Sequence, residues 1–359
     1  MTTTDALDTT FMRVLSASAT ARPFVLALAG VGLALALSGL LVLGSGKSPL
    51  AAYGSLASGA LGSRDRIAVA LNKATPYLLT ATGVALCFRA QVINIGGEGQ
   101  IAVGGLAATW VALALPDAPA GVLPIVAALV GALAGAAWAA LAALVRLTRN
   151  VHEVLVTLLM NFIGVLFVSE MLHGELGEPG AGFPQSPLLA RAAWLPRLIR
   201  ETDLHVGILI ALAAVVAAHL LLWRTPFGFR LRLRGASAPA AIYSGVSMKR
   251  SLLSVMLVAG GLAGLAGALE VLGVHYRLIE GFSSGFGFTA VSIALIGGLN
   301  PLGVLPAGLF FAFLETGALA MQRAVGVPSP LVLVIQGLTM VFVLAAVALP
   351  APARRALRT

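Results

Sequence analysis

This chain of 359 residues contains a single cysteine, Cys87, and very little charge. One thiol forms neither an intramolecular disulfide nor a multi-thiolate metal site. The five histidines are scattered without the paired spacing of a metal-binding helix, so we expect no bound metal. Charged residues make up only 10% of the sequence, whereas soluble domains are roughly a quarter charged. This composition argues against a soluble fold.

The chain is rich in long apolar runs. Hydrophobic residues make up 59% of the sequence, and ten runs approach the ~20 residues that a helix needs to cross a bilayer. They are 24–43, 67–88, 94–115, 121–145, 154–172, 204–223, 252–274, 282–298, 302–321 and 329–349. The third, fifth and eighth runs are polar enough that eight or nine spans remain an alternative. We predict an all-α polytopic transmembrane bundle over residues 24–349, between an N-terminal segment, 1–23, and a basic tail, 350–359.

The distribution of arginine and lysine predicts the orientation. Six cations and no acid lie from Arg224 to Arg250, between the sixth and seventh runs. Basic loops stay on the cytoplasmic side, so this loop, the N-terminal segment and the C-terminal tail are predicted to be cytoplasmic. Topology and attraction to anionic membrane lipid account for the net charge of +9. No nucleic-acid partner is therefore expected.

Two glycine-rich breaks interrupt the apolar pattern. The stretch 91–105 reads QVINIGGEGQIAVGG, and 285–290 reads GFGFTA. Lipid neither satisfies freed backbone groups nor solvates a carboxylate, so such breaks persist only where protein or a water-filled cavity surrounds them. By the predicted topology they enter from opposite sides, as an inverted repeat of spans two to five and seven to ten would produce, with the broken helices meeting near the midplane. Close helix packing through small residues is the alternative.

The breaks supply the candidate residues of a translocation pathway. They are Asn94, Gly96, Gly97, Glu98, Gln100, Phe286, Phe288 and Thr289. Glu98 falls at a helix N-terminus, where unpaired amides favour a negative charge. In the alternative interpretation, Glu98 pairs with Arg89 or caps its helix. The two phenylalanines suit stacking on a base, or core packing.

Three further carboxylates lie within or near spans. Glu170, Glu270 and Glu315 are expected to face the protein interior, with no role assigned by their spacing.

Neither nucleotide-binding look-alike fits its structural context. Residues 44–48, GSGKS, follow a predicted span and precede a proline, and residue 41, where the first glycine of a phosphate loop belongs, is leucine. Residues 97–102 match a dinucleotide fingerprint without any alternating strand and helix pattern. No nucleophile and base set recurs at enzyme spacing. We expect a non-catalytic chain that binds no cofactor.

Four segments together resemble a known family. They are 88–100 (FRAQVINIGGEGQ), 153–161 (EVLVTLLMN), 235–250 and 285–303, which ends GLNPLG. They are similar to permease subunits of bacterial nucleoside-type ABC importers, in the branched-chain amino acid and ribose permease superfamily. The NIGGEGQ string resembles the branch served by basic membrane lipoproteins.

The resemblance implies a mechanism and partners. A nucleoside or related small polar solute, delivered by an extracytoplasmic substrate-binding lipoprotein, crosses the inner membrane between this permease and a second one, as a heterodimer. ATP is hydrolysed at a separate ABC ATPase. The residues implied in ATPase coupling are Arg149, Glu153, Gly235, Ala240, Ala241 and Gly245. The family's usual glutamate is Pro239 here, which a first helical turn tolerates, so a short coupling helix starting there stays open.

Several alternatives stay open at this point. The same broken helices and buried glutamates suit a secondary transporter driven by an ion gradient, and an ABC permease of this type can carry a simple sugar instead of a nucleoside. The segments assigned to ATPase coupling can also be read as basic loops that face lipid.

Overall fold

The structure, a computed structural model, describes residues 29–283 and 285–348. Over these residues the regular structure is helical, with two isolated β-bridges and no strand. The predicted all-α class is confirmed. The chain divides into two compact units, one formed by residues 60–316 and the other by residues 1–59 together with 317–359. The predicted segments 1–23 and 350–359 lie outside the described residues.

A helix lies in each of the ten predicted runs, although the first run begins outside the described residues. The helices are Ala29–Gly44, α2 (Pro49–Leu61), α3 (Arg64–Arg89), α4 (Gly97–Ala114), α5 (Leu123–Arg149), α6 (Glu153–His173), α7 (Gly207–Arg224), α8 (Pro226–Ala236), α9 (Ala238–Tyr243), α10 (Met248–Glu270) with a π-turn (Val271–His275), α11 (Phe286–Ile296), α12 (Pro301–Val325) and α13 (Ser329–Ala348). Among the described helices, α5, α6, α7, α10 with its π-turn, and α12 are long and apolar enough to span a bilayer.

The segment from Arg224 to Arg250 corrects one expectation. It is not a simple loop, because it folds into α8 and α9. Each helix has a serine or threonine cap and a proline in its first turn: Thr225 Oγ1 accepts from the Gly228 amide, and Ser237 Oγ from the Ala240 amide. Such caps satisfy amides that a short helix leaves unpaired. The hydrophobic pattern predicts neither helix, because both lie outside the apolar runs. The short coupling helix left open at Pro239 is present as α9, which has that proline in its first turn.

Glycines let three helices of the larger unit approach closely. A Cβ at Gly264 of α10 would lie 2.4 Å from the Gly131 carbonyl oxygen of α5. A Cβ at Gly104 of α4 would lie 2.3 Å from the Gly264 carbonyl oxygen. Backbones this close exclude any larger residue, which is how small residues build helix interfaces in membranes. The packing role weighed for the glycines is therefore present in this part of the fold.

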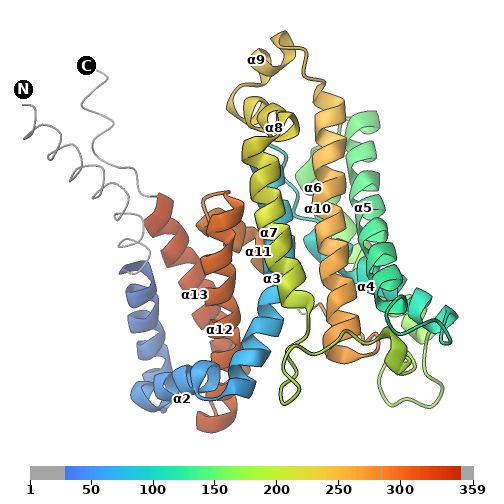
Figure 1. The fold of residues 1–359 in the computed structure, drawn as a ribbon. Helices are drawn as coiled ribbons and strands as arrows, with labels where there is room; N and C mark the ends of the chain where they lie inside the picture. The colour runs from blue at the N-terminus through green and yellow to red at the C-terminus, as the bar shows by residue number, and fades with distance from the viewer. Residues whose placement is uncertain (1–28, 284, 349–359) are drawn as a thin grey trace, which may run out of the picture. The chain divides into compact units, whose positions relative to one another are not determined.

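The larger unit carries different structures at its two ends. The short helices α8 and α9 lie beyond one end of α7 and α10, and the connection from α6 to α7 runs past the opposite end (Figure 1). Because α3, α7 and α10 join these ends, residues at the N-terminal end of α3 and the C-terminal end of α10 lie on the side of the α6–α7 connection.

In the smaller unit, Val42 and Ala52 pack with α12 and α13 residues around Ile335. The GSGKS stretch, 44–48, forms the turn between the helix Ala29–Gly44 and α2. Gly46 there has φ of +77°. The stretch is thus a connection between helices, as expected, with no strand before it to form a phosphate loop.

Candidate functional site

Glu98 joins the N-terminal ends of two broken helices. Its carboxylate lies in the first turn of α4 and accepts hydrogen bonds from α11 and the residues just before it. Gly285 N–H donates at 3.0 Å, Gly287 N–H at 2.7 Å and Ser283 Oγ at 2.6 Å. The side chain is only 5% exposed. Donated hydrogen bonds and the positive ends of two helices stabilise this buried charge.

The first turns of α4 and α11 are in direct backbone contact. A Cβ at Gly287 would lie 2.1 Å from the backbone nitrogen of Glu98. Gly285, the N-cap of α11, has φ of +82°, which glycine adopts without steric cost. The two glycine-rich breaks therefore meet in space, because their glycines allow both the contact and the turn.

Amide side chains hold the loop that precedes α4. Asn94 Oδ1 accepts from the Gly96 amide at 2.9 Å and from Gln100 Nε2 at 3.2 Å. Asn161 of α6 donates to the Ile95 carbonyl at 2.8 Å and accepts from the Gly99 amide at 2.9 Å. Asn94, Gln100 and Asn161 are at most 2% exposed. These bonds satisfy backbone groups that the broken helix frees, as membrane burial requires.

The alternative pairing of Glu98 with Arg89 does not occur. The Arg89 guanidinium lies over the Trp223 ring at 5.3 Å from its centroid. The structure shows Glu98 as a cap, but its carboxylate caps α11 and not its own helix, α4. Sequence spacing does not reveal that partner, because Gly287 is 189 residues away.

A cavity of about 470 Å³ opens beside this junction. Its charged and amide lining comes from α3, the end of α10 and the segment before α7: Asn72, Lys73, Arg197, Asp203, Glu270 and His275. Phe282 and Phe286 add aromatic faces. Such a mixture of a few convergent polar groups and apolar faces is typical of small-molecule sites.

Lys73, which lines this cavity, forms an ion pair next to the Phe286 ring. Lys73 Nζ lies 2.6 Å from Glu315 Oε1, and Tyr77 OH donates to the other carboxylate oxygen. The Phe286 ring meets the Tyr77 ring edge to face at 5.2 Å, and Lys73 Nζ lies 5.9 Å from the Phe286 centroid. A second carboxylate, Glu270, lies 3.5 Å from His275 Nε2. These contacts fix the charged groups around the aromatic face.

Most predicted pathway residues are near the cavity but do not line it. Of the eight, Phe286 lines the cavity, and Asn94, Glu98 and Gln100 are buried in the junction behind it. Gly96 and Gly97 form the turn into α4, where a Cβ at Gly97 would lie 3.2 Å from the Gly287 Cα. Phe288 is 42% exposed, away from the cavity lining, and Thr289 is half-buried one residue further along α11.

Apart from Glu270, the polar residues that line the cavity were not singled out from the sequence. Lys73 was the available signal, since a lysine inside an apolar run points to an interior partner. Glu270 and Glu315 face the interior as expected. Glu170 does not: it is exposed, because it lies in the last turn of α6, where that helix ends.

The residues expected to couple to an ATPase lie at the opposite end of the unit. Glu153 forms an ion pair with Arg146 at 3.0 Å, while Arg149 is exposed at the end of α5. A Cβ at Gly235 would lie 1.9 Å from the Arg89 carbonyl oxygen, so α8 packs directly on the end of α3. Burial lowers the pKa of Arg234, and the negative charge of the Glu153 carboxylate partly offsets this effect. The close packing of Gly235 on Arg89 holds α8 against the bundle.

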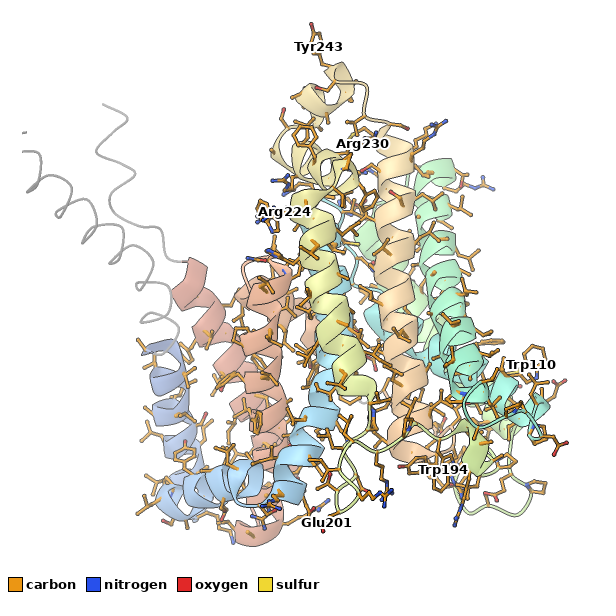
Figure 2. All side chains as sticks on the ribbon, viewed as in Figure 1. Trp110, Trp194, Glu201, Arg224, Arg230 and Tyr243 are labelled. Carbon is orange, nitrogen blue, oxygen red and sulfur yellow. The ribbon has the colours of Figure 1, made fainter. Side chains whose placement is uncertain are left out.

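The exposed tip at this end is α9. Within α9, Ala241 is buried and Ala240 is exposed; Gly245, just after the helix, is also exposed. Tyr243 is 95% and Ile242 62% exposed, and Figure 2 shows Tyr243 pointing away from the helix bundle. An exposed tyrosine and isoleucine on a protruding helix form a small apolar surface of the kind found at protein interfaces. Neither residue was singled out from the sequence.

Comparison with known proteins identifies the family. Residues 66–344 match the family described as branched-chain amino acid transport system, permease component. This chain belongs to that family of permeases. A glucose ABC transporter permease of Haloferax volcanii is 36% identical over 87% of this chain and 84% of that protein. A guanosine ABC transporter permease of Bacillus subtilis is 34% identical over 87% of this chain and 90% of that protein.

A third relative is a nucleoside ABC transporter permease of Lactococcus lactis, 30% identical over 86% of each chain. No solved structure matches this chain. The resemblance drawn from the NIGGEGQ motif is confirmed. The protein is a multi-pass membrane permease of an ABC importer and a non-catalytic transport subunit, which works with a partner ATPase and a substrate-binding protein. The ion-gradient alternative is not supported.

Proposed function

We propose that this permease carries a nucleoside through the cavity beside the Glu98 junction. The observation that carries the proposal is the lining of that cavity. Phe282 and Phe286 offer faces on which a base can stack, and Asn72, Lys73 and Glu270 offer donors and acceptors for ribose hydroxyls. Two relatives named as guanosine and nucleoside permeases support the same substrate class.

The cavity would receive substrate from outside the cell. With the basic segment Arg224 to Arg250 in the cytoplasm, the cavity lies toward the external end of α3 and α10. The α6–α7 connection on that side is the surface we assign to an extracytoplasmic substrate-binding lipoprotein. The termini are then cytoplasmic, and the membrane is the bacterial plasma membrane.

At the cytoplasmic end, α9 is proposed to receive the ABC ATPase. Tyr243 and Ile242 are its exposed apolar residues, and α8 connects them to α3, which carries Lys73 in its N-terminal half. A second permease completes the pathway as a heterodimer. We propose that this chain itself binds no cofactor and that ATP binds only at the ATPase, because neither glycine-lysine nor dinucleotide look-alike has the context of a phosphate site.

The test is uptake by the reconstituted transporter. Proteoliposomes containing both permeases, the ATPase and the binding protein should accumulate labelled guanosine or uridine in an ATP-dependent way. Phe286→Leu should raise KM about tenfold by removing a stacking face, at ~1–3 kcal/mol per stacked base. Phe288→Leu is the matched control, since its ring lies off the cavity, and should change KM less than about twofold.

Competition identifies the substrate class. Excess unlabelled nucleoside should abolish uptake, and excess glucose should leave it unchanged. If labelled glucose is taken up and unlabelled nucleoside does not compete with it, the substrate is a sugar, as in the name of the Haloferax relative. Uptake that survives ATP depletion would contradict both.

A further inference from the structure

A second cavity lies at the α8–α9 end of the larger unit, far along the bundle from the one just described. It has a volume of about 440 Å³ and is bounded by α8, the segment 244–247 and the first turns of α10. Arg230 and Arg250 line it together with hydroxyls of Ser244, Ser247, Ser251 and Ser254. No acidic residue lines it. Its composition is therefore cationic and rich in donors.

The charge in this cavity is uncompensated. Within the described residues, neither Arg230 nor Arg250 forms an ion pair. The α10 helix begins at the cavity rim, where Ser247 Oγ caps it by accepting from the Arg250 amide at 3.4 Å. The positive end of a helix of 23 residues adds to the field of the guanidinium groups.

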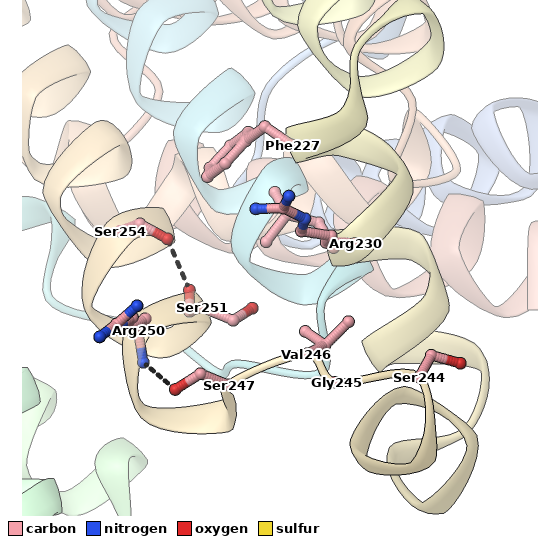
Figure 3. Close-up of a pocket in the computed structure, with 10 residues that line it drawn as sticks. Phe227, Arg230, Ser244, Gly245, Val246, Ser247, Arg250, Ser251 and Ser254 are labelled. Carbon is pink, nitrogen blue, oxygen red and sulfur yellow. Dashed lines mark hydrogen bonds between the residues drawn. The ribbon is translucent and has the colours of Figure 1, made fainter.

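One buried hydroxyl points into this space without a partner. Ser251 is 8% exposed, and its Oγ has no hydrogen-bond partner among the residues that the structure describes. Figure 3 shows the Ser251 side chain directed toward the space that the Arg230 side chain enters from α8. A buried hydroxyl without a partner is unfavourable, and an acceptor bound in this cavity would give Ser251 Oγ one.

We propose that this cavity binds a phosphate group. Phosphate oxygens accept from arginine, from hydroxyls and from amides at a helix N-terminus, all of which are present here. The group can belong to the head of an anionic phospholipid or to a soluble phosphate. Because the site touches both α8 and the base of α10, an occupied site would tie the segment that carries α9 to the transmembrane bundle.

A cysteine placed in the cavity reports occupancy. Val246→Cys is suitable, because Val246 is half-buried in the lining and the native Cys87 is fully buried. The full-length Val246→Cys chain is labelled with a maleimide in nanodiscs of phosphatidylcholine. Two additions are compared: inorganic phosphate in solution, with sodium chloride at equal ionic strength as control, and phosphatidylglycerol in the bilayer. Each arm tests one source of the phosphate group.

We expect at least one addition to slow labelling about fivefold or more, as charge-assisted contacts protect the cavity. Arg230→Gln should abolish the protection and Ser251→Ala should weaken it. Arg224→Gln should retain it, because Arg224 is an equally exposed cation that lies outside the lining. Protection by phosphatidylglycerol alone assigns the site to a lipid head, and protection by phosphate alone assigns it to a soluble ligand.

Three results would overturn the proposal. The first is that neither addition changes the labelling rate. The second is that sodium chloride protects as well as phosphate does, and the third is that Arg224→Gln loses protection to the same degree as Arg230→Gln. The last two would mean that general electrostatic attraction, not a built site, accounts for the effect.

Discussion

Glu98, in the first turn of α4, accepts a hydrogen bond of 2.7 Å from the backbone amide of Gly287, in the first turn of α11. One carboxylate thus holds together two helices whose sequences lie almost two hundred residues apart. The bond is buried and charge-assisted, and the amide it satisfies is one that the start of α11 leaves unpaired. The junction of the two breaks therefore depends on the negative charge of Glu98.

Glu98→Gln should lower both transport and the stability of the chain. Glutamine keeps one acceptor oxygen, but its NH₂ group is a donor and would face the donor groups of Ser283, Gly285 and Gly287. The loss should be about 2–3 kcal/mol, seen as a lower Tm in detergent, and uptake should fall at least about tenfold. Glu170→Gln is the control, because Glu170 is exposed at the end of α6. Wild-type Tm and uptake in Glu98→Gln would show that the charge is dispensable.

Gly287→Ala should separate α4 from α11. The added Cβ would lie 2.1 Å from the Glu98 nitrogen, which is backbone that cannot swing aside. Overpacking of this kind costs about 1–3 kcal/mol and should lower Tm and uptake together. Gly121→Ala is the comparison, because nothing lies within 4 Å of its Cβ. Equal Tm values for the two variants would contradict the close approach.

The Lys73–Glu315 ion pair should show a measurable coupling energy. Both side chains are partly buried, 22% and 18% exposed, so the charges are less screened than on an open surface. A double-mutant cycle with Lys73→Met and Glu315→Gln should give a coupling of about 1–3 kcal/mol in thermal unfolding. The exposed pair Arg197–Asp203 is the control and should give below ~1 kcal/mol. Comparable values for the two pairs would refute an interior role for Lys73.

Cysteines at the two ends of the larger unit should be labelled from opposite sides of the membrane. A membrane-impermeant maleimide should modify Glu201→Cys in intact cells, but Tyr243→Cys only after the cytoplasmic face is opened. Tyr243 is the suitable site because it is 95% exposed, whereas the segment 230–235 lies in α8 and Gly235 packs against α3. Cys87 is fully buried and gives no background. Labelling of Tyr243→Cys in intact cells would invert the topology.

The sequence located the helices well and the site only in part. Apolar run length places a helix in each of the ten runs, because burial in lipid demands ~20 apolar residues regardless of tertiary contacts. Run length did not reveal α8 and α9, because both are shorter than a span and begin at the caps Thr225 and Ser237. The glycine-rich pattern drew attention to Glu98 and Phe286, because a carboxylate and an aromatic residue beside glycine breaks are unusual in spans.

Other parts of the site depend on contacts between distant segments. Lys73 of α3 and Glu270 of α10 line one cavity, and Glu315 of α12 forms an ion pair with Lys73. Nothing in the sequence spacing of these three residues brings them together. The same holds for Ser251, whose unpaired hydroxyl becomes informative only when Arg230 lies across from it. Sequence periodicity describes a face of one helix, whereas a site needs the mutual orientation of several.

By itself the sequence determined that this protein is an all-α membrane permease with two glycine-rich breaks, because the solvent properties of lipid constrain composition and backbone at every span. Tertiary structure alone decided which residues join the two breaks, that Glu98 caps α11 rather than pairing with Arg89, and that the polar cavity lies beside the junction. These features follow from glycine contacts at which two backbones touch, and such contacts are a property of the packed helices, not of any one segment.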